Sequence, residues 1–141
     1  MIDFSFSLGA YENLKRVNSE GYEFNFLSNI TDNFLLSGSY SKTDSTNKEG
    51  IRLTRLPQEK ANLNFDLSYG LKNKIFLSFF YNGNETDPRG IVKSWVRSDV
   101  NFSREVRNNI RMYLRIKNIF DENYQDIYGY GTEERLSLIH I

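Results

Sequence analysis

Apolar and polar residues alternate along most of this chain, and this period-two pattern constrains its fold more than any other feature. From Ala61 to Tyr69 the odd-numbered residues are apolar or aromatic, and the residues between them are Asn, Asp and Ser. Residues 110–117 repeat the pattern, with Arg or Lys at most polar positions. The same alternation, with some exceptions, is found in 2–8, 22–26, 34–40, 75–81 and 96–102. Because successive side chains of a strand point to opposite faces, each segment predicts a strand with one apolar face.

The connections between the predicted strands alternate between short and long. The short ones are 31–33, 70–74 and 103–108, and the long ones are 9–19, 42–58, 82–94 and 119–134. In an antiparallel meander this order places all the long loops at one end and all the short turns at the other. Outer-membrane barrels show this asymmetry, and their strands need about 9–11 residues to cross the hydrocarbon.

Aromatic residues agree with a membrane barrel, since they make up 15% of the chain. Tyr40, Tyr69, Tyr81 and Phe102 fall at predicted strand ends, where aromatic rings form interfacial girdles. The sequence therefore predicts an all-β fold, an antiparallel up-and-down meander of about 7–8 strands within a transmembrane barrel. A soluble β-sandwich or lipocalin-like barrel is the alternative, because its strands alternate in the same way.

Composition excludes several classes of function. The 18 basic residues balance the 18 acidic ones, so no bulk charge indicates nucleic-acid binding. The chain has no Cys and its single His is His140, which leaves few routes to catalysis or zinc binding, so we predict neither an enzyme nor a cofactor. Acidic residues in the long loops are potential Ca²⁺ ligands, but such residues are usually only solvated, so we predict no metal site. These residues are Asp44, Glu49, Glu85 and Asp87.

The two ends of the chain indicate how much of the sequence is native and whether it is a fragment. Residues 1–4 lack the basic and apolar regions of a signal peptide, which an exported protein needs, so the barrel interpretation predicts a fragment. The last six residues, Leu-Ser-Leu-Ile-His-Ile, have a back-translation, CTG TCT CTT ATA CAC ATC, that resembles the transposon end of sequencing-library adapters. We therefore interpret 136–141 as an adapter-derived segment and 1–135 as native.

Two motifs carry a family resemblance. Segment 118–124, Asn-Ile-Phe-Asp-Glu-Asn-Tyr, resembles the Asn-Leu-Phe-Asp-x-x-Tyr signature near the C-terminus of TonB-dependent outer-membrane receptors. Segment 128–135 resembles the Tyr-Gly-Tyr-x-Thr-x-Gly-Arg run of the vitamin B12 receptor branch, except that Glu134 stands where that branch has Gly. Weaker likenesses, in the family's order, lie at 11–13, 21–23 and 53–57. The residues that carry the two main motifs are Asn118, Phe120, Asp121, Tyr124, Tyr128, Gly129, Tyr130 and Arg135.

The resemblance implies the C-terminal part of a barrel of about 22 strands, closed by an N-terminal plug that contacts TonB. It also implies location in the outer membrane, among lipid and lipopolysaccharide, and uptake of cobalamin or a related ligand. A ferric-siderophore or haem receptor is the nearest alternative. A small eight-stranded structural barrel is another, and it requires a last strand that pairs with 1–8.

Two expectations follow for individual residues. The signature is expected to be structural, with Asn118, Asp121 and Asn123 bonding backbone groups and with Phe120 and Tyr124 packing at the membrane boundary. One set of charged residues is expected to face the barrel lumen, where it either anchors the plug or is solvated. This set comprises Arg97, Asp99, Arg111, Arg115 and Lys117.

Overall fold

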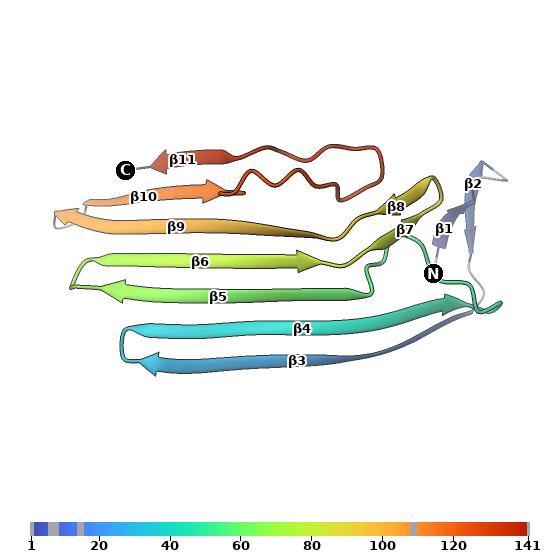
Figure 1. Cartoon of the computed structure of the whole chain (residues 1–141), viewed down its shortest axis with the longest axis horizontal. Helices are drawn as coiled ribbons and strands as arrows, with labels where there is room; N and C mark the ends of the chain where they lie inside the picture. The colour runs from blue at the N-terminus through green and yellow to red at the C-terminus, as the bar shows by residue number, and fades with distance from the viewer. Residues whose placement is uncertain (1, 6–8, 14–15, 108–109, 141) are drawn as a thin grey trace.

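The computed structural model describes residues 2–5, 9–13, 16–107 and 110–140, and these form one large antiparallel sheet with two separate hairpins (Figure 1). The order of the seven strands in the sheet is β11 (Leu136–His140), β10 (Ile110–Lys117), β9 (Trp95–Arg107), β6 (Asn73–Asn82), β5 (Glu59–Tyr69), β4 (Phe34–Asn47) and β3 (Val17–Thr31). Neighbours in this order are also neighbours along the chain once the β7–β8 hairpin, β7 (Glu85–Asp87) and β8 (Gly90–Val92), is set aside. The predicted up-and-down meander is therefore confirmed.

The strand register separates an apolar face from a polar face, as the alternation predicted. Residues directly opposite each other in a sheet share a face. One row across five strands consists of Leu36, Phe65, Leu77, Val100 and Ile116. The neighbouring row on the other face consists of Ser37, Asn64, Ser78 and Asp99. Aromatic contacts link the apolar rows, with the ring centroids of Phe65 and Phe79 5.8 Å apart.

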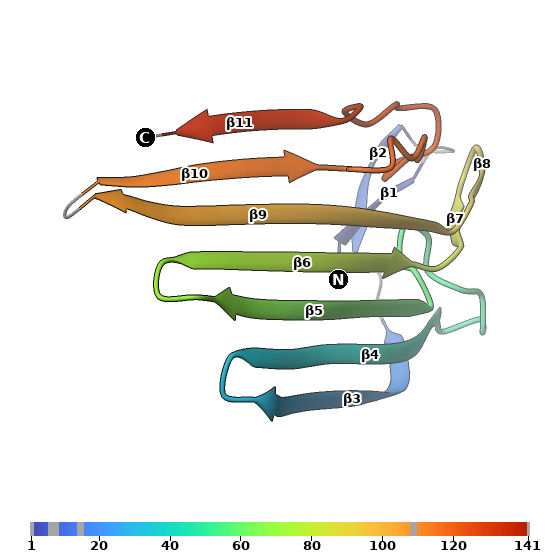
Figure 2. The ribbon, with the colours of Figure 1, turned by 60° about the vertical axis from the view of Figure 1, so that its left-hand side comes forward.

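The two ends of the sheet differ in the way that the loop lengths predicted. Short turns join β3 to β4, β5 to β6, and β9 to β10, all at one end (Figures 1 and 2). Segments 48–58, 83–94 and 118–135 leave the sheet at the opposite end, which we call the long-loop end. Over the described residues no helix is long and apolar enough to span a bilayer.

The N-terminal part differs from the prediction. The segment predicted as the first strand, 2–8, lies within the described residues only at 2–5, and these do not begin the meander, because β1 (Ile2–Ser5) pairs with β2 (Ala10–Asn13) in a two-stranded sheet of its own. Segment 9–19 is not one long loop, since β2 and the start of β3 lie within it. β3 and β4 also extend through polar residues, with the Ser19 and Ser45 hydroxyls 2.8 Å apart. Strand pairing uses backbone groups, so it continues where the apolar alternation has stopped.

An eight-stranded closed barrel required the first strand to pair with the last. In the described part of the chain, β3 and β11 are instead the two edges of the large sheet, and β1 pairs only with β2. The structure therefore gives an open sheet.

Strand β11 pairs with β10 in an unusual phase. Leu136 and Leu138 lie opposite Lys117 and Arg115, on the polar face, while Ser137 shares the apolar face with Ile116. The apolar residues of β4, β5 and β6 lie mainly on the other face. Ile139, opposite Leu114, adds one apolar pair to the backbone pairing of this strand, and the adapter origin of 136–141 stays a prediction.

The girdle candidates occupy two levels of the apolar face. Tyr40 and Tyr81 lie in one row through Ala61, toward the long-loop end, while Phe102 and Tyr69 lie toward the short turns. Tyr40 and Phe102 are not at strand ends as expected, because β4 continues to Asn47 and β9 to Arg107. Their role as an interfacial girdle stays a prediction.

Candidate functional site

The register places all five lumen candidates on the polar face, but the structure brings only two of them together. Arg97 lies opposite Phe80, Asp99 opposite Ser78, Arg115 opposite Asn101 and Arg111 opposite Glu105, with Lys117 in phase with Arg115. Arg97 and Asp99 form an ion pair, with Nε and Oδ1 3.1 Å apart. The other three form no ion pair within the described part of the chain. That this face lines a barrel lumen stays a prediction.

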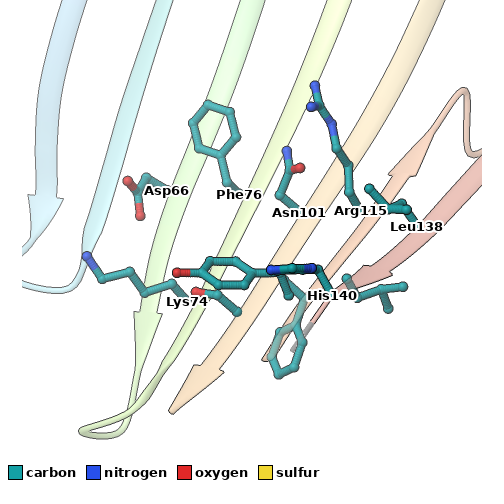
Figure 3. Close-up of a pocket in the computed structure, with 11 residues that line it drawn as sticks. Asp66, Lys74, Phe76, Asn101, Arg115, Leu138 and His140 are labelled. Carbon is teal, nitrogen blue, oxygen red and sulfur yellow. The ribbon is translucent and has the colours of Figure 1, made fainter. Parts of the chain in front are cut away.

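A hollow of about 370 Å³ lies on the same face toward the short turns. Figure 3 shows Asp66, Lys74, Phe76, Asn101 and Arg115 around it, with Leu138 and His140 on its far side. Because those last two belong to segment 136–141, one wall of the hollow depends on residues that we interpret as adapter-derived. We therefore place no site there.

Asp99 is the centre of a buried polar cluster near the long-loop end. Its side chain is 6% exposed and accepts hydrogen bonds from Nε and Nη2 of Arg97 at 3.1 and 3.3 Å. Its Oδ1 also accepts the backbone N–H of Asn118 at 3.0 Å. The Asp99 carboxylate therefore holds both the Arg97 guanidinium on its own strand and the backbone of Asn118, the residue directly after β10.

Asn118 turns the chain out of β10. It has a φ of +52°, in the left-handed region that Asn tolerates better than most residues. Its side chain closes a ring with Glu122, because Oδ1 accepts the Glu122 N–H at 2.9 Å and Nδ2 donates to the Glu122 carbonyl at 3.0 Å. Asp121, with a φ of +57°, accepts the N–H of Arg135 at 2.8 Å. Asn118 and Asp121 thus bond backbone groups, as the sequence predicted, while the described hydrogen bonds include none from the Asn123 side chain.

Tyr124 packs within the polar cluster around Arg97. It is 8% exposed, its ring packs against Trp95 with ring centroids 4.4 Å apart, and its hydroxyl accepts a hydrogen bond from Nη1 of Arg97 at 3.2 Å. Packing of Tyr124 at the membrane boundary stays a prediction. Phe120 is 75% exposed, so packing of its ring within the described chain is not observed. We call Arg97, Asp99, Asn118, Tyr124 and Trp95 the signature cluster.

Replacing Asn118 with Ala is expected to lower the free energy of unfolding by about 2 kcal/mol, because Glu122 loses two hydrogen-bond partners. Asn118→Gly loses the same bonds but tolerates the positive φ, so it should be less destabilising by about 1 kcal/mol. Denaturant unfolding followed by fluorescence of Trp95, the single Trp, measures both variants. Equal stability of Asn118→Ala and the unmodified protein would contradict the assignment.

A second cluster joins the three long loops. The Asp87 side chain is 1% exposed; Oδ2 accepts Nε of Arg55 at 2.9 Å, and Oδ1 accepts Nε of Arg89 at 3.0 Å. The backbone N–H of Arg89 also donates to Oδ1 at 3.0 Å. Burial raises the pKa of Asp87, but the hydrogen bonds from Arg89 and Arg55 outweigh it and lower the pKa to about 2. We call Asp87, Arg55 and Arg89 the loop cluster.

The residues of the vitamin B12-like motif pack against this cluster. The Arg89 guanidinium lies over the rings of Tyr128 and Tyr130, 5.9 and 5.5 Å from their centroids. Tyr128 also covers Gly90, where an added Cβ would come within 2.3 Å of the ring. Gly129 has a φ of +82°, a conformation that glycine adopts without steric cost. Arg135 contacts Asp121 and the Ile119 carbonyl, so it belongs to the turn after β10.

The acidic loop residues do not gather into a metal site among the described residues. Asp44 pairs with Arg52, Glu49 with Lys48, and Glu85 accepts a hydrogen bond from Nδ2 of Asn82 at 2.6 Å. Asp87 has a guanidinium on each oxygen, an arrangement that disfavours a second cation.

Sequence reasoning missed Arg55, Arg89 and Trp95. These residues lie in loops or at a strand end, and the partners described above on other segments are separated from them by about thirty to forty positions, so no period reveals the contacts. The single Trp was an available signal, because Trp is usually buried with its ring packed.

No protein-family model matches this sequence, and no curated protein matches it. Solved structures do match its fold. The ferric-catecholate import receptor Fiu of E. coli K12, in its closed form, aligns over 98% of this chain with a TM-score of 0.75 and 21% identity. The siderophore receptor PiuA of Acinetobacter baumannii aligns over 93% with a TM-score of 0.74 and 20% identity. The ferripyoverdine receptor of the outer membrane of Pseudomonas aeruginosa aligns over 87% with a TM-score of 0.74 and 14% identity.

The fold is that of a segment of a TonB-dependent receptor barrel. This chain spans 22%, 22% and 19% of the lengths of Fiu, PiuA and the ferripyoverdine receptor. These three receptors are named for a ferric catecholate, a siderophore and ferripyoverdine, so the likeness offers nothing specific to the vitamin B12 branch.

Proposed function

We propose that this chain is part of the wall of a TonB-dependent receptor that takes up a small ligand across the bacterial outer membrane. The observation that carries the proposal is the meander itself, with an apolar face across its strands and long loops at one end only. A membrane wall needs both features, because lipid covers one face and only the external loops are free to lengthen.

The apolar face supports contact with lipid. Several of its large side chains remain exposed, which is unusual for a protein surface in water. They include Tyr22, Phe24, Leu67, Val96 and Met112. In this proposal the polar face lines the lumen, where Arg111, Arg115 and Lys117 contact water or a plug segment, and the plug in turn contacts TonB.

The ligand is proposed as a ferric siderophore or a cobalamin. The siderophore is favoured by the three receptors described above, which are named for a ferric catecholate, a siderophore and ferripyoverdine. Cobalamin depends on the likeness of segment 128–135 to the vitamin B12 branch. In the structure Tyr128 and Tyr130 of that segment lie against Arg89, a loop contact that does not require either ligand. No catalytic step belongs to the proposal.

The genomic sequence around the coding region tests this proposal. We expect an open reading frame that continues upstream of codon 1 into a signal peptide and a plug-sized domain. Deletion of that gene should abolish uptake of a radiolabelled ferric siderophore or of radiolabelled cobalamin, and the label that is lost identifies the ligand class. A stop codon directly before codon 1, or unchanged uptake of both labels in the deletion strain, would overturn the proposal.

A further inference from the structure

We propose that Asp87 couples the three long loops into one cooperative unit, so that they open and close together. This inference concerns the dynamics of the loops and goes beyond the uptake function. It rests on the way each oxygen of one buried carboxylate serves a different neighbour.

The first neighbour is loop 48–58. Nε of Arg55 lies 2.9 Å from Oδ2 of Asp87, and the backbone N–H of Arg55 donates to the carbonyl of Thr86 at 2.8 Å. Arg55 has a φ of +59°, a conformation that a non-glycine residue keeps only when its contacts hold it there. Loop 48–58 is therefore fixed to the β7–β8 hairpin by both side chain and backbone.

The second neighbour is loop 118–135. The Asp87 carboxylate accepts hydrogen bonds from both the side chain and the backbone N–H of Arg89 and so orients that residue. The oriented Arg89 guanidinium lies over Tyr128 and Tyr130. Close packing of Tyr128 on Gly90 adds a contact to the same hairpin. Asp87 is thus a positioning residue, since it acts on loop 118–135 through Arg89.

The hairpin connects these two loops, which have no direct polar contact with each other in the described part of the chain. Among the described hydrogen bonds and ion pairs, none joins 48–58 directly to 118–135. Loss of the Asp87 charge removes the partner of both Arg55 and Arg89, whereas loss of either arginine leaves the other contact in place. Substitution of Asp87 and substitution of either arginine are therefore expected to give different patterns of loop opening.

Hydrogen exchange in the full-length protein, read by mass spectrometry in detergent micelles, distinguishes these patterns. Asp87→Asn is expected to raise amide exchange in both 48–58 and 118–135 by about tenfold or more, the effect of losing one charge-assisted hydrogen bond. Arg55→Ala should raise it only in 48–58, and Arg89→Ala only in 118–135. Glu49→Gln is the matched control, because Glu49 pairs only with the exposed Lys48 and should change neither loop.

Lowering the pH tests the same inference on the unmodified protein. The pKa of Asp87 is lowered when folded, so its contribution is present above the unfolded value of 3.8 and is lost as pH falls toward about 2. Both loops should lose protection with one shared midpoint in this window, while β5 and β6 amides report whether the barrel remains folded. No other acidic side chain lies within ion-pair distance of Arg55 or Arg89 in the described chain.

Three results would overturn the inference. The first is an Asp87→Asn variant that opens one loop only, as an arginine variant should, and the second is a single arginine variant that opens both loops. The third is separate pH midpoints for the two loops of the unmodified protein. Each outcome concerns exchange rather than uptake, so failure here is distinct from failure of the transport proposal.

Discussion

Replacing Asp99 with Asn is expected to lower the free energy of unfolding by about 3–5 kcal/mol, the largest effect that we predict for any substitution in this chain. The carboxylate is 6% exposed and the Arg97 side chain 27% exposed, so the variant leaves a mostly buried guanidinium without its counter-ion. The Asn118 N–H keeps an acceptor only if the new amide presents its oxygen. We expect a value near the lower limit, because part of Arg97 reaches solvent.

Denaturant unfolding of the full-length protein measures this effect, with fluorescence of Trp95 as the local signal. The Trp95 ring packs against Tyr124, and the Tyr124 hydroxyl accepts a hydrogen bond from Arg97. The fluorescence emission of Trp95 therefore reports on the same cluster. Asp44→Asn is the matched control, since Asp44 is 61% exposed and pairs with an Arg52 that is 38% exposed. An exposed pair of this kind contributes about 0–1 kcal/mol. Equal losses for the two variants would show that Asp99 has no special role.

Replacing Leu63 with Arg is expected to destabilise the folded state in a bilayer by about 2–4 kcal/mol, because it places a charge near the middle of the hydrocarbon. Leu63 lies midway along β5 on the apolar face, opposite Gly38 and Phe79. Asn64→Arg, one residue on and on the polar face, should change stability by less than about 1 kcal/mol.

Depth along the strand separates a membrane wall from a soluble core. Tyr69→Arg lies on the same face as Leu63 but at the short-turn end, and it should cost only about 0–1 kcal/mol. Reversible folding of the full-length protein into lipid vesicles, with urea as denaturant, gives all three values. A cost at Tyr69 that equals the cost at Leu63 would contradict a lipid-facing surface and would favour a soluble barrel.

The strands were the predictable part of this molecule. Alternation along a strand is local, since it depends only on successive side chains pointing to opposite faces, so the residue order alone assigns Leu63 and Asn64 to opposite faces. The alternation of long and short connections then places the long loops at one end of the sheet and the short turns at the other. The positive φ values of Asn118 and Asp121 were not predicted, although Asn and Asp adopt this conformation more readily than other non-glycine residues.

The ends of the strands and the pairing of the N-terminal strand were less predictable. β4 runs on to Asn47 and β3 begins at Val17 because backbone pairing does not require apolar side chains. The alternation in 2–8 indicated a strand but could not show its partner, and β1 pairs with β2 rather than with the meander. The contacts of Tyr124 were not predictable for a related reason, since a loop residue has no period that assigns it to a face.

The sequence by itself determined an all-β meander, the identity of its two faces and the grouping of its long loops at one end, because each of these depends on neighbouring residues or on chain length. Only the tertiary structure decided which distant side chains meet. Asp87 with Arg55, and Asp99 with Asn118, are brought together by the return of the chain from one strand to the next, whereas Arg89 and Arg97 lie two residues from the carboxylates that they bind. Contacts of this kind depend on the path of three loops in space, and no local pattern along the chain encodes them.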